Sequence, residues 1–268
     1  ATRVNAQGLV ENVQILSSNL VSNGNFSQEG VQEVSNGSFS QEGAEEITNG
    51  DFATDSNWVK GTGWSISGGK GVATNTTINS MYQDVLTLSK SYKASFTISS
   101  IENGSLKIGI GINFSQEFTE VGTYTYYGTP SNDSLLRITP SNGTNATIDN
   151  VSVKEVGQDW TLEDGWSIEE NKAVANVIGT QAIYQSGITL NKYYKVTYTI
   201  SDYVSGDIRV RVGTSSTPTV RSSNGTFTEY LFATGVDQIR ISPFIGGFIG
   251  SITNISVKEV GQNWSLGT

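Results

Sequence analysis

Apolar and polar residues alternate at every second position along several stretches of the chain. Tyr, Ala, Phe and Ile alternate with polar residues over 92–98, and Leu and Ile alternate with lysine and glycine over 106–112. The stretches 194–200 and 208–212 repeat these patterns. A two-residue period predicts β-strands with one buried and one exposed face. No segment carries a helical stripe over three turns, so we expect an all-β chain.

A domain-sized duplication organises the chain. Residues 148–160, which contain Ser-Val-Lys-Glu-Val-Gly-Gln, return as 252–264, and the spacing is 252 − 148 = 104 residues. A repeat of that length is a small domain, most economically a β-sandwich of about eight to ten short strands. We expect this chain to be part of a longer tandem array, with more protein before Ala1. The sequence divides into a connector, module 1, module 2 and the start of a further copy, over residues 1–45, 46–157, 158–261 and 262–268.

A finer repeat of 13 residues leads into module 1. Three units share a β-branched residue, an Asn-Gly pair and a phenylalanine, and we name them the first repeat (21–26), the second repeat (34–39) and the third repeat (47–52). Their spacing is 34 − 21 = 13 and 47 − 34 = 13 residues. One such unit buries too little apolar surface to fold alone. The units are either strands that add to a neighbouring sheet or a linker left by duplication of the module's first strand, and the sequence favours neither.

Both modules close with a strand whose apolar pattern changes parity. In module 1 the apolar residues are Ile148, Val151 and Val153, and the same shift occurs over 252–257. One extra residue, a β-bulge, restores the alternation. Bulges re-aim side chains and often lie beside functional sites, which makes Asp149 a residue of interest.

The composition excludes several kinds of chemistry. The chain has no Cys and no His, so it lacks disulfides, thiolate metal sites, the most common general base and the most common zinc ligand. Its net charge of −9 is the wrong sign for a nucleic-acid partner. No run approaches the roughly 18 apolar residues of a membrane span, so we expect no membrane insertion. Acidic residues are scattered without a pair placed for hydrolysis, so we expect no enzyme activity.

The order of several motifs resembles a known family of modules. The motifs are, in order, Asn49–Phe52, Gly63–Ile66, Tyr82–Gln83, Lys90–Lys93 and Ile148–Val153. This order is similar to that of the jelly-roll carbohydrate-binding modules of the family 4 and 9 kind. The resemblance covers both modules, and it implies two tandem jelly-roll sandwiches behind an extended N-terminal repeat region.

The linker Val-Lys-Glu-Val-Gly-Gln and the 13-residue repeats resemble tandem modules of bacteriophage tail-fibre and virion appendage proteins. The resemblance implies a non-enzymatic, extracellular fibre segment at a virion surface, with weak glycan binding at a host surface. The alternative is a secreted bacterial polysaccharide-binding array attached to an enzyme or adhesin. A homo-oligomer is also implied, a trimer by analogy with phage fibres, and we expect Phe26 and Phe39 to be buried between its chains.

Modules of this family often hold a structural calcium ion between the opening strand and an Asp of the closing strand. The resemblance places that ion in module 1, on Asp51 and Asp149, with nearby backbone carbonyls as further hard oxygen ligands. Module 2 has Thr253 in place of Asp149 and lacks the Asn-Gly-Asp opening, so we expect no ion there. A turn at Asp51 and a bulge capped by Asp149 would explain the same residues without an ion.

Aromatic side chains on exposed strand faces are candidates for stacking on sugar rings. Trp64 and Trp166 are each followed by Ser and Ile in a strand pattern, so we assign them to the core. Tyrosines at solvent-facing positions, with two neighbouring glutamines, are better candidates for glycan contact, although packing at the sandwich edge would account for them too. These residues are Tyr82, Gln83, Tyr126, Tyr127, Tyr184, Gln185, Tyr203 and Tyr230.

Overall fold

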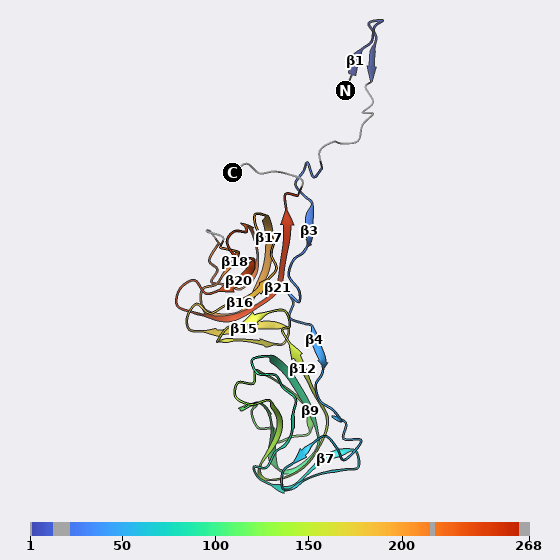
Figure 1. The fold of residues 1–268 in the computed structure, drawn as a ribbon, viewed down its shortest axis with the longest axis vertical. Coiled ribbons are helices and arrows are strands. Elements are labelled where there is room, and N and C mark those ends of the chain that lie inside the picture. Colours follow the sequence, from blue (N-terminus) through green and yellow to red (C-terminus); the bar gives the residue numbers. More distant parts are fainter. Residues whose placement is uncertain (1, 13–21, 215–217, 263–268) are drawn as a thin grey trace.

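The computed structural model describes residues 2–12, 22–214 and 218–262, and two β-sandwich modules lie end to end in it (Figure 1). The described residues form strands, turns and loops without a helix, so the predicted all-β, tandem-sandwich fold is confirmed. Among these residues there is accordingly no helix long and apolar enough to cross a membrane. A short hairpin of β1 (Thr2–Val4) and β2 (Val10–Asn12) comes before the modules in the chain.

Module 1 is organised by two long strands that pass through both of its layers. The strand β12 pairs with β8 over Leu135–Ile138 and with β7 over Thr144–Ile148, while β9 pairs with β10 near one end and with β11 near the other. The strands are β5 (Val59–Lys60), β6 (Trp64–Ser67), β7 (Lys70–Thr76), β8 (Met81–Asp84), β9 (Ser91–Ile110), β10 (Asn113–Phe114), β11 (Gly122–Gly128) and β12 (Leu135–Val156).

Module 2 repeats this plan with two separate sheets. One sheet has the order β14-β15-β21-β17-β19, and the smaller one has the order β13-β16-β20-β18. The strands are β13 (Thr161–Leu162), β14 (Trp166–Glu169), β15 (Lys172–Val177), β16 (Ile183–Ser186), β17 (Tyr193–Gly206), β18 (Arg209–Val212), β19 (Gly225–Phe232), β20 (Gln238–Ser242) and β21 (Phe248–Val260).

The alternating apolar residues fill the space between the layers of each module. Ala94, Phe96 and Ile98 are buried in module 1, and their counterparts over 196–200 are buried in module 2. The tryptophans assigned to the core are buried as predicted, and each indole N–H finds a backbone carbonyl, which a buried indole requires. The acceptor is the carbonyl of residue 79 in module 1 and of residue 181 in module 2, at 2.7 and 3.1 Å.

The N-terminal segment runs back along both modules, and the stretches between its repeats add a strand to each of them. The strand β3 (Glu29–Gln32) pairs with β21 of module 2, and β4 (Glu42–Glu45) pairs with β12 of module 1 (Figure 1). We call these two pairings the seam. The second repeat follows β3 and enters module 2, and the third repeat follows β4 and enters module 1. The order is therefore reversed along the chain: the second repeat belongs to module 2, and the third repeat belongs to module 1.

Each inserted repeat completes a core with its phenylalanine. Phe39 of the second repeat is 1% exposed and packs on Trp160 with ring centroids 5.3 Å apart. Phe52 of the third repeat is equally buried and packs on Trp58 at the same distance. The Trp160 indole N–H also lies 3.1 Å from the carbonyl of Asn36, as the Trp58 N–H lies 2.9 Å from that of residue 49.

The Asn-Gly pair of each repeat docks on the bulge of a closing strand. The carbonyl of Gly37 accepts the Ile255 N–H at 2.8 Å, and that of Gly50 accepts the Val151 N–H at 2.9 Å. A Cβ atom at either glycine would lie 2.0–2.1 Å from the carbonyl oxygen of the same bulge residue, so only glycine fits. Both predicted bulges are confirmed, because the register of each closing strand shifts between residues 149 and 152 and between 253 and 256.

The prediction that Phe39 is buried between chains is wrong, because its ring lies inside module 2 of its own chain. Within the stretch 1–45, which we assigned to a connector, β3 and β4 pair with strands of module 2 and module 1. Of the two interpretations of the repeats, addition to a sheet is the one that the structure supports, although the added strands are the stretches just before the second and third repeats. Residues 13–21, which include the first residue of the first repeat, lie outside the described residues.

Paired charges hold the two seam strands in the same way. Glu42 accepts hydrogen bonds from Lys93 at 2.6 Å and Lys154 at 3.0 Å. Glu29 is bound likewise by Lys195 and Lys258 on module 2. The hydrogen bond from Lys93, followed by that from Lys154, holds the pKa of Glu42 below its ordinary value of 4.5.

Substitution of the inserted phenylalanines is expected to unfold one module at a time. Phe39→Ala empties part of the module 2 core, and Phe52→Ala does the same in module 1, each at a cost of about 3–5 kcal/mol. Scanning calorimetry should show the module 2 transition lowered by the first change and the module 1 transition by the second. If Phe39→Ala lowered the module 1 transition instead, the assignment of the second repeat would be wrong.

Acid is expected to loosen the seam. The folded pKa of Glu42 is lowered, so its contribution to stability is present above 4.5 and is lost as the pH falls through the folded value. The unfolding temperature should therefore fall below pH 4.5, and less steeply in a Glu29→Gln, Glu42→Gln double variant. Equal slopes for the variant and the parent chain would show that the seam charges contribute nothing.

Candidate functional site

The outer face of the small sheet in module 2 brings an aromatic residue and arginines together. Tyr184 on β16 lies opposite Arg240 on β20, which lies opposite Arg211 on β18. Directly opposite residues project from the same face of an antiparallel sheet. All three side chains are half-buried, so each presents part of its surface to solvent. We call this row the arginine face, and it includes Arg209 further along β18.

Arg240 is held in place from two sides. Its guanidinium lies 5.5 Å from the centre of the Tyr184 ring. Its Nη2 atom lies 3.0 and 3.1 Å from the two carboxylate oxygens of Glu163. Glu163 in turn accepts the backbone N–H of Ala182 at 2.7 Å. A fixed ring beside a fixed guanidinium is a geometry that suits stacking on a sugar ring together with hydrogen bonds to its hydroxyl or carboxylate groups.

The other two arginines add positive potential to this face. Arg209 lies over the Phe244 ring at 4.6 Å. Burial first, and then the charges of Arg209 and Arg240, lower the pKa of Arg211. Within the described residues, the Nε atoms of Arg209 and Arg211 have no hydrogen-bond partner. Three guanidiniums therefore gather on one face of a chain whose net charge is −9, and an acidic or polyhydroxylated ligand would suit them.

The matching face of module 1 is less suited to a ligand. Tyr82 lies opposite Arg137, but Gly109 stands where module 2 has its second arginine. Arg137 turns aside to Asp133, 2.7 Å away, and to a backbone carbonyl. The ring of Phe114 covers the glycine, because a Cβ atom there would lie 2.5 Å from that ring.

Sequence reasoning identified Tyr184 but missed the arginines beside it. The available signal was the pair Arg209 and Arg211 on alternate positions of one strand in a chain poor in basic residues. Their meeting with Arg240 depends on strand pairing between β18 and β20. That pairing cannot be read from local sequence.

The two glutamine candidates have a different role from the sugar contact we expected. Gln185 is buried, and its amide accepts the N–H of Ser35 at 2.7 Å and donates to the carbonyl of the same residue at 3.0 Å. Gln83 holds Thr48 in the same two-bond arrangement. Both amides therefore anchor an inserted repeat, and their placement does not support ligand contact.

The remaining tyrosine candidates are spread over other surfaces. Tyr126 packs against the module 1 core and Tyr127 against that of module 2. Tyr203 donates its hydroxyl to the carbonyl of Gly206 at 3.0 Å. Tyr230 lies on β19 of the larger sheet. The structure therefore does not combine the predicted tyrosines into one glycan site.

The residues proposed for calcium make local contacts in the structure. Asp51 accepts the N–H of Ala53 at 3.3 Å. Asp149 forms an ion pair with Lys70 at 3.0 Å and accepts the N–H of Asn150 at 2.8 Å, inside the bulge. The described residues contain no group of three acidic side chains that could cage an ion. Calcium in module 1 stays a prediction, and these contacts fit the turn and bulge roles without it.

A buried carboxylate in module 2 takes part in two hydrogen bonds and one ion pair. Glu229 accepts the hydroxyl of Tyr198 and the N–H of Thr219, both at 2.8 Å, and lies 3.8 Å from the Nε atom of Arg221. Burial, and then the bond to Glu229, raise the pKa of Tyr198. With its oxygens occupied by these partners, the carboxylate is placed for stability rather than for hydrolysis.

No protein-family model and no curated protein matches the chain. Among solved structures, the chain is similar to the tandem CBM22-1–CBM22-2 domain of Paenibacillus barcinonensis Xyn10C, at 9% identity and a TM-score of 0.33, over 82% of this chain and 99% of that chain. It is also similar to the tandem CBM51 modules of Sp3GH98, a family 98 glycoside hydrolase of Streptococcus pneumoniae SP3-BS71, at 9% identity and a TM-score of 0.25, over 87% of this chain and 96% of that chain. Both are tandem carbohydrate-binding modules, and neither concerns the family 4 and 9 kind or a phage appendage.

Proposed function

We propose that this chain is a non-enzymatic spacer, a stiff segment of an extracellular appendage in which jelly-roll modules are joined end to end. The observation that carries the proposal is the seam, because one N-terminal segment pairs with β21 of module 2 and with β12 of module 1. Domains joined by a single linker reorient by default. Here a second covalent connection, fixed by strand pairing at both ends, opposes that motion.

Direct packing at the junction supports the same role. Val156, at the end of β12, is 5% exposed and belongs to the module 2 core, against which Tyr127 also packs. Gly157 lies so close to Ile168 that a Cβ atom would be 2.5 Å from its side chain. The end of module 1 is therefore covered by module 2 rather than by solvent.

The setting that we propose is the surface of a phage virion, based on the resemblance of the linker and the repeats to appendage proteins. A homo-oligomer remains part of this proposal. The burial of Phe39 does not support it, because that ring lies inside module 2 of its own chain. A secreted bacterial polysaccharide-binding array is the alternative setting. The seam would stiffen the array in either one.

Glycan contact on the arginine face is a second candidate function. It is favoured by the row of Tyr184, Arg240 and Arg211, which presents an aromatic ring beside cations. A spacer with weak contacts gains useful affinity when many copies face the same surface. The expected ligand is an acidic oligosaccharide.

Distance measurements between the modules test the spacer function. The chain has no Cys, so spin labels can be placed on Ile112→Cys in module 1 and Ile178→Cys in module 2, both at exposed positions. We expect one narrow distance distribution, as narrow as that of a reference pair within module 2, Ile178→Cys with Val204→Cys. Phe39→Ala should broaden the first distribution, because it loosens the second repeat.

A broad distribution between the modules in the otherwise unchanged chain would contradict the spacer function. It would mean that the seam does not restrict the junction. The reference pair within module 2 distinguishes that result from mobility of the labels themselves.

Glycan contact is tested by titrating the chain with an oligosaccharide of uronic acids and following the amide resonances of module 2. We expect a dissociation constant nearer millimolar than nanomolar for one module, weakened roughly five- to tenfold by Tyr184→Ala, since one ring contact contributes about 1 kcal/mol. Tyr82→Ala in module 1 is the matched control and should change little. If no amide resonance shifted at millimolar ligand, glycan contact would be contradicted and only the spacer function would remain.

A further inference from the structure

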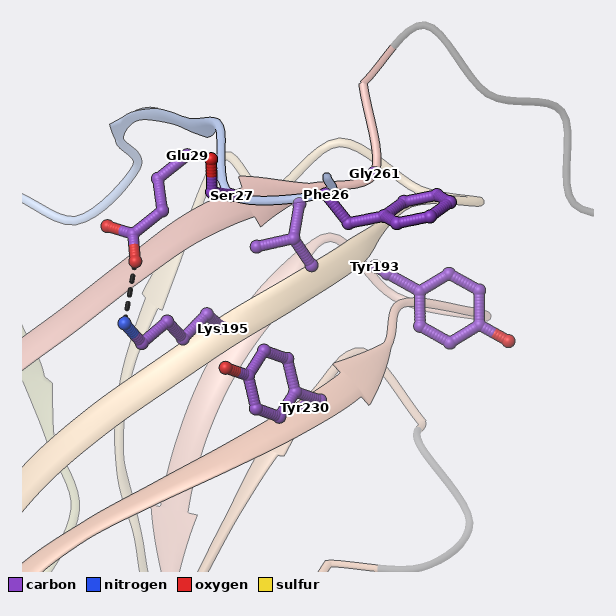
Figure 2. A pocket seen from close by; sticks show the side chains of 8 residues that line it. Phe26, Ser27, Glu29, Tyr193, Lys195, Tyr230 and Gly261 are labelled. Carbon is purple, nitrogen blue, oxygen red and sulfur yellow. Dashed lines mark hydrogen bonds and ion pairs between the residues drawn. The ribbon is translucent and has the colours of Figure 1, made fainter. Parts of the chain in front are cut away.

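Module 2 ends in an apolar groove beside the first repeat. The groove has a volume of about 430 Å³, and Figure 2 shows the rings of Phe26, Tyr193 and Tyr230 gathered along it, with the Glu29–Lys195 ion pair at one side. We call it the end groove. Its lining residues are Phe26, Ser27, Glu29, Tyr193, Lys195, Tyr230, Val260 and Gly261.

The end groove repeats the surface by which module 1 contacts module 2. Tyr230 lies opposite Lys195 on the neighbouring strand, as Tyr127 lies opposite Lys93 in module 1. Val260 ends the closing strand of module 2 and Gly261 follows it, as residues 156 and 157 do in module 1. Glu29 binds its two lysines as the corresponding glutamate of module 1 does.

The two equivalent surfaces differ in what covers them. In module 1 the glycine at position 157 is pressed against module 2, whereas a Cβ atom at Gly261 would meet no atom of the described residues within 4 Å, although the two backbones have nearly the same φ of 73° and 75°. Tyr230 is 65% exposed, whereas its equivalent Tyr127 packs on the next module's core. The end groove thus has the form of a junction surface that faces solvent.

The first repeat already has the shape of an inserted repeat. Asn23 and Phe26 have φ values of 52° and 56°, matching the 46° and 54° of Asn36 and Phe39. The side-chain amide of Asn23 donates to the carbonyl of Gln262 at 3.4 Å, as that of Asn36 donates to residue 158 at 3.2 Å. Phe26 is nevertheless 57% exposed, whereas its counterpart in the second repeat is 1% exposed.

We propose that the end groove and the first repeat together seat a third jelly-roll module of the same kind, which follows Gln262. We identify the occupant from the junction between modules 1 and 2. There the equivalent surface of module 1, together with an inserted repeat, is covered by the module that follows in the chain. In sequence, Gln-Asn-Trp-Ser-Leu over 262–266 matches Gln-Asp-Trp-Thr-Leu over 158–162, which puts Trp264 at the position of Trp160. The first repeat then supplies the opening segment of that module.

The charges around the groove agree with a module rather than a charged ligand. Glu29 is bound by both Lys195 and Lys258, so the ionic groups at the rim satisfy one another. The three rings that remain are apolar surface, which a module core covers in the equivalent junction. The inference extends the proposed spacer function by stating how the array grows, and it rests on that function only in treating the modules as an end-to-end series.

An extended chain tests the proposal. In this extended chain, residues 1–262 are followed by a second copy of residues 159–262. We choose this copy because module 2 covers the equivalent surface of module 1 in the parent chain. Tyr230→Cys supplies a single thiol, since the chain has no Cys, and its rate of reaction with a small aromatic disulfide is measured. We expect the rate to fall at least tenfold from the parent chain to the extended chain. Tyr127→Cys is the matched control and should react slowly in both.

A second variant reports on the first repeat. Phe26→Ala should leave the unfolding temperatures of the parent chain within a degree or two, but should lower the transition of the added module in the extended chain by roughly ten degrees or more. Phe39→Ala should produce the same loss for module 2 in both chains.

Three results would overturn the proposal. The first is an unchanged thiol rate at Tyr230→Cys in the extended chain. The second is an added module that shows no unfolding transition, or one that is unaffected by deletion of residues 22–28. The third is a dimer of the parent chain by light scattering that Phe26→Ala abolishes, which would assign the groove to a second copy. None of these readouts depends on the distance between modules 1 and 2, so failure here is distinguishable from failure of the spacer function.

Discussion

The fold depends on one close contact, the docking of a glycine carbonyl on the bulge of a closing strand. Gly37 and Gly50 accept the bulge N–H groups of Ile255 and Val151, and their missing side chains allow the backbones to approach. This contact fixes how far each repeat enters its module. The phenylalanine two residues after the glycine can then pack on a tryptophan of that module. A buried N–H without such an acceptor would cost about 1–3 kcal/mol, so each module requires its repeat.

Because the repeats serve the modules in reverse order, the chain must close long loops before either core is complete. Asn36 binds residue 158, which is 122 positions away, and Gln32 binds Ile255 across 223 positions. Contacts of such separation slow folding, since loop closure costs entropy before the contact forms. The same closure explains the stiffness proposed for the segment, because neither module can turn away without breaking strand pairs on the seam.

Local patterns were sufficient to predict the sandwiches, the buried tryptophans and the bulges, since each rests on the two-residue period or on a break in it. The partners of the repeats could not be predicted, because Val34–Phe39 and Ile47–Phe52 look alike locally and only strand pairing assigns them to different modules. The role of Gln83 and Gln185 could not be predicted for the same reason, since they lie next to half-buried tyrosines but bind backbone from the N-terminal segment. The arginine face was missed because its members come from separate strands.

The central claim, that the second repeat is part of module 2, is tested most directly by hydrogen exchange of backbone amides. The Ser35 N–H is bound to Gln185, and the Ile255 N–H is bound to Gly37. We predict that both exchange only when module 2 unfolds, with the same opening free energy as the core amide of Val196. Exchange of Ser35 at the rate of an unfolded chain, while Val196 stays protected, would contradict the account.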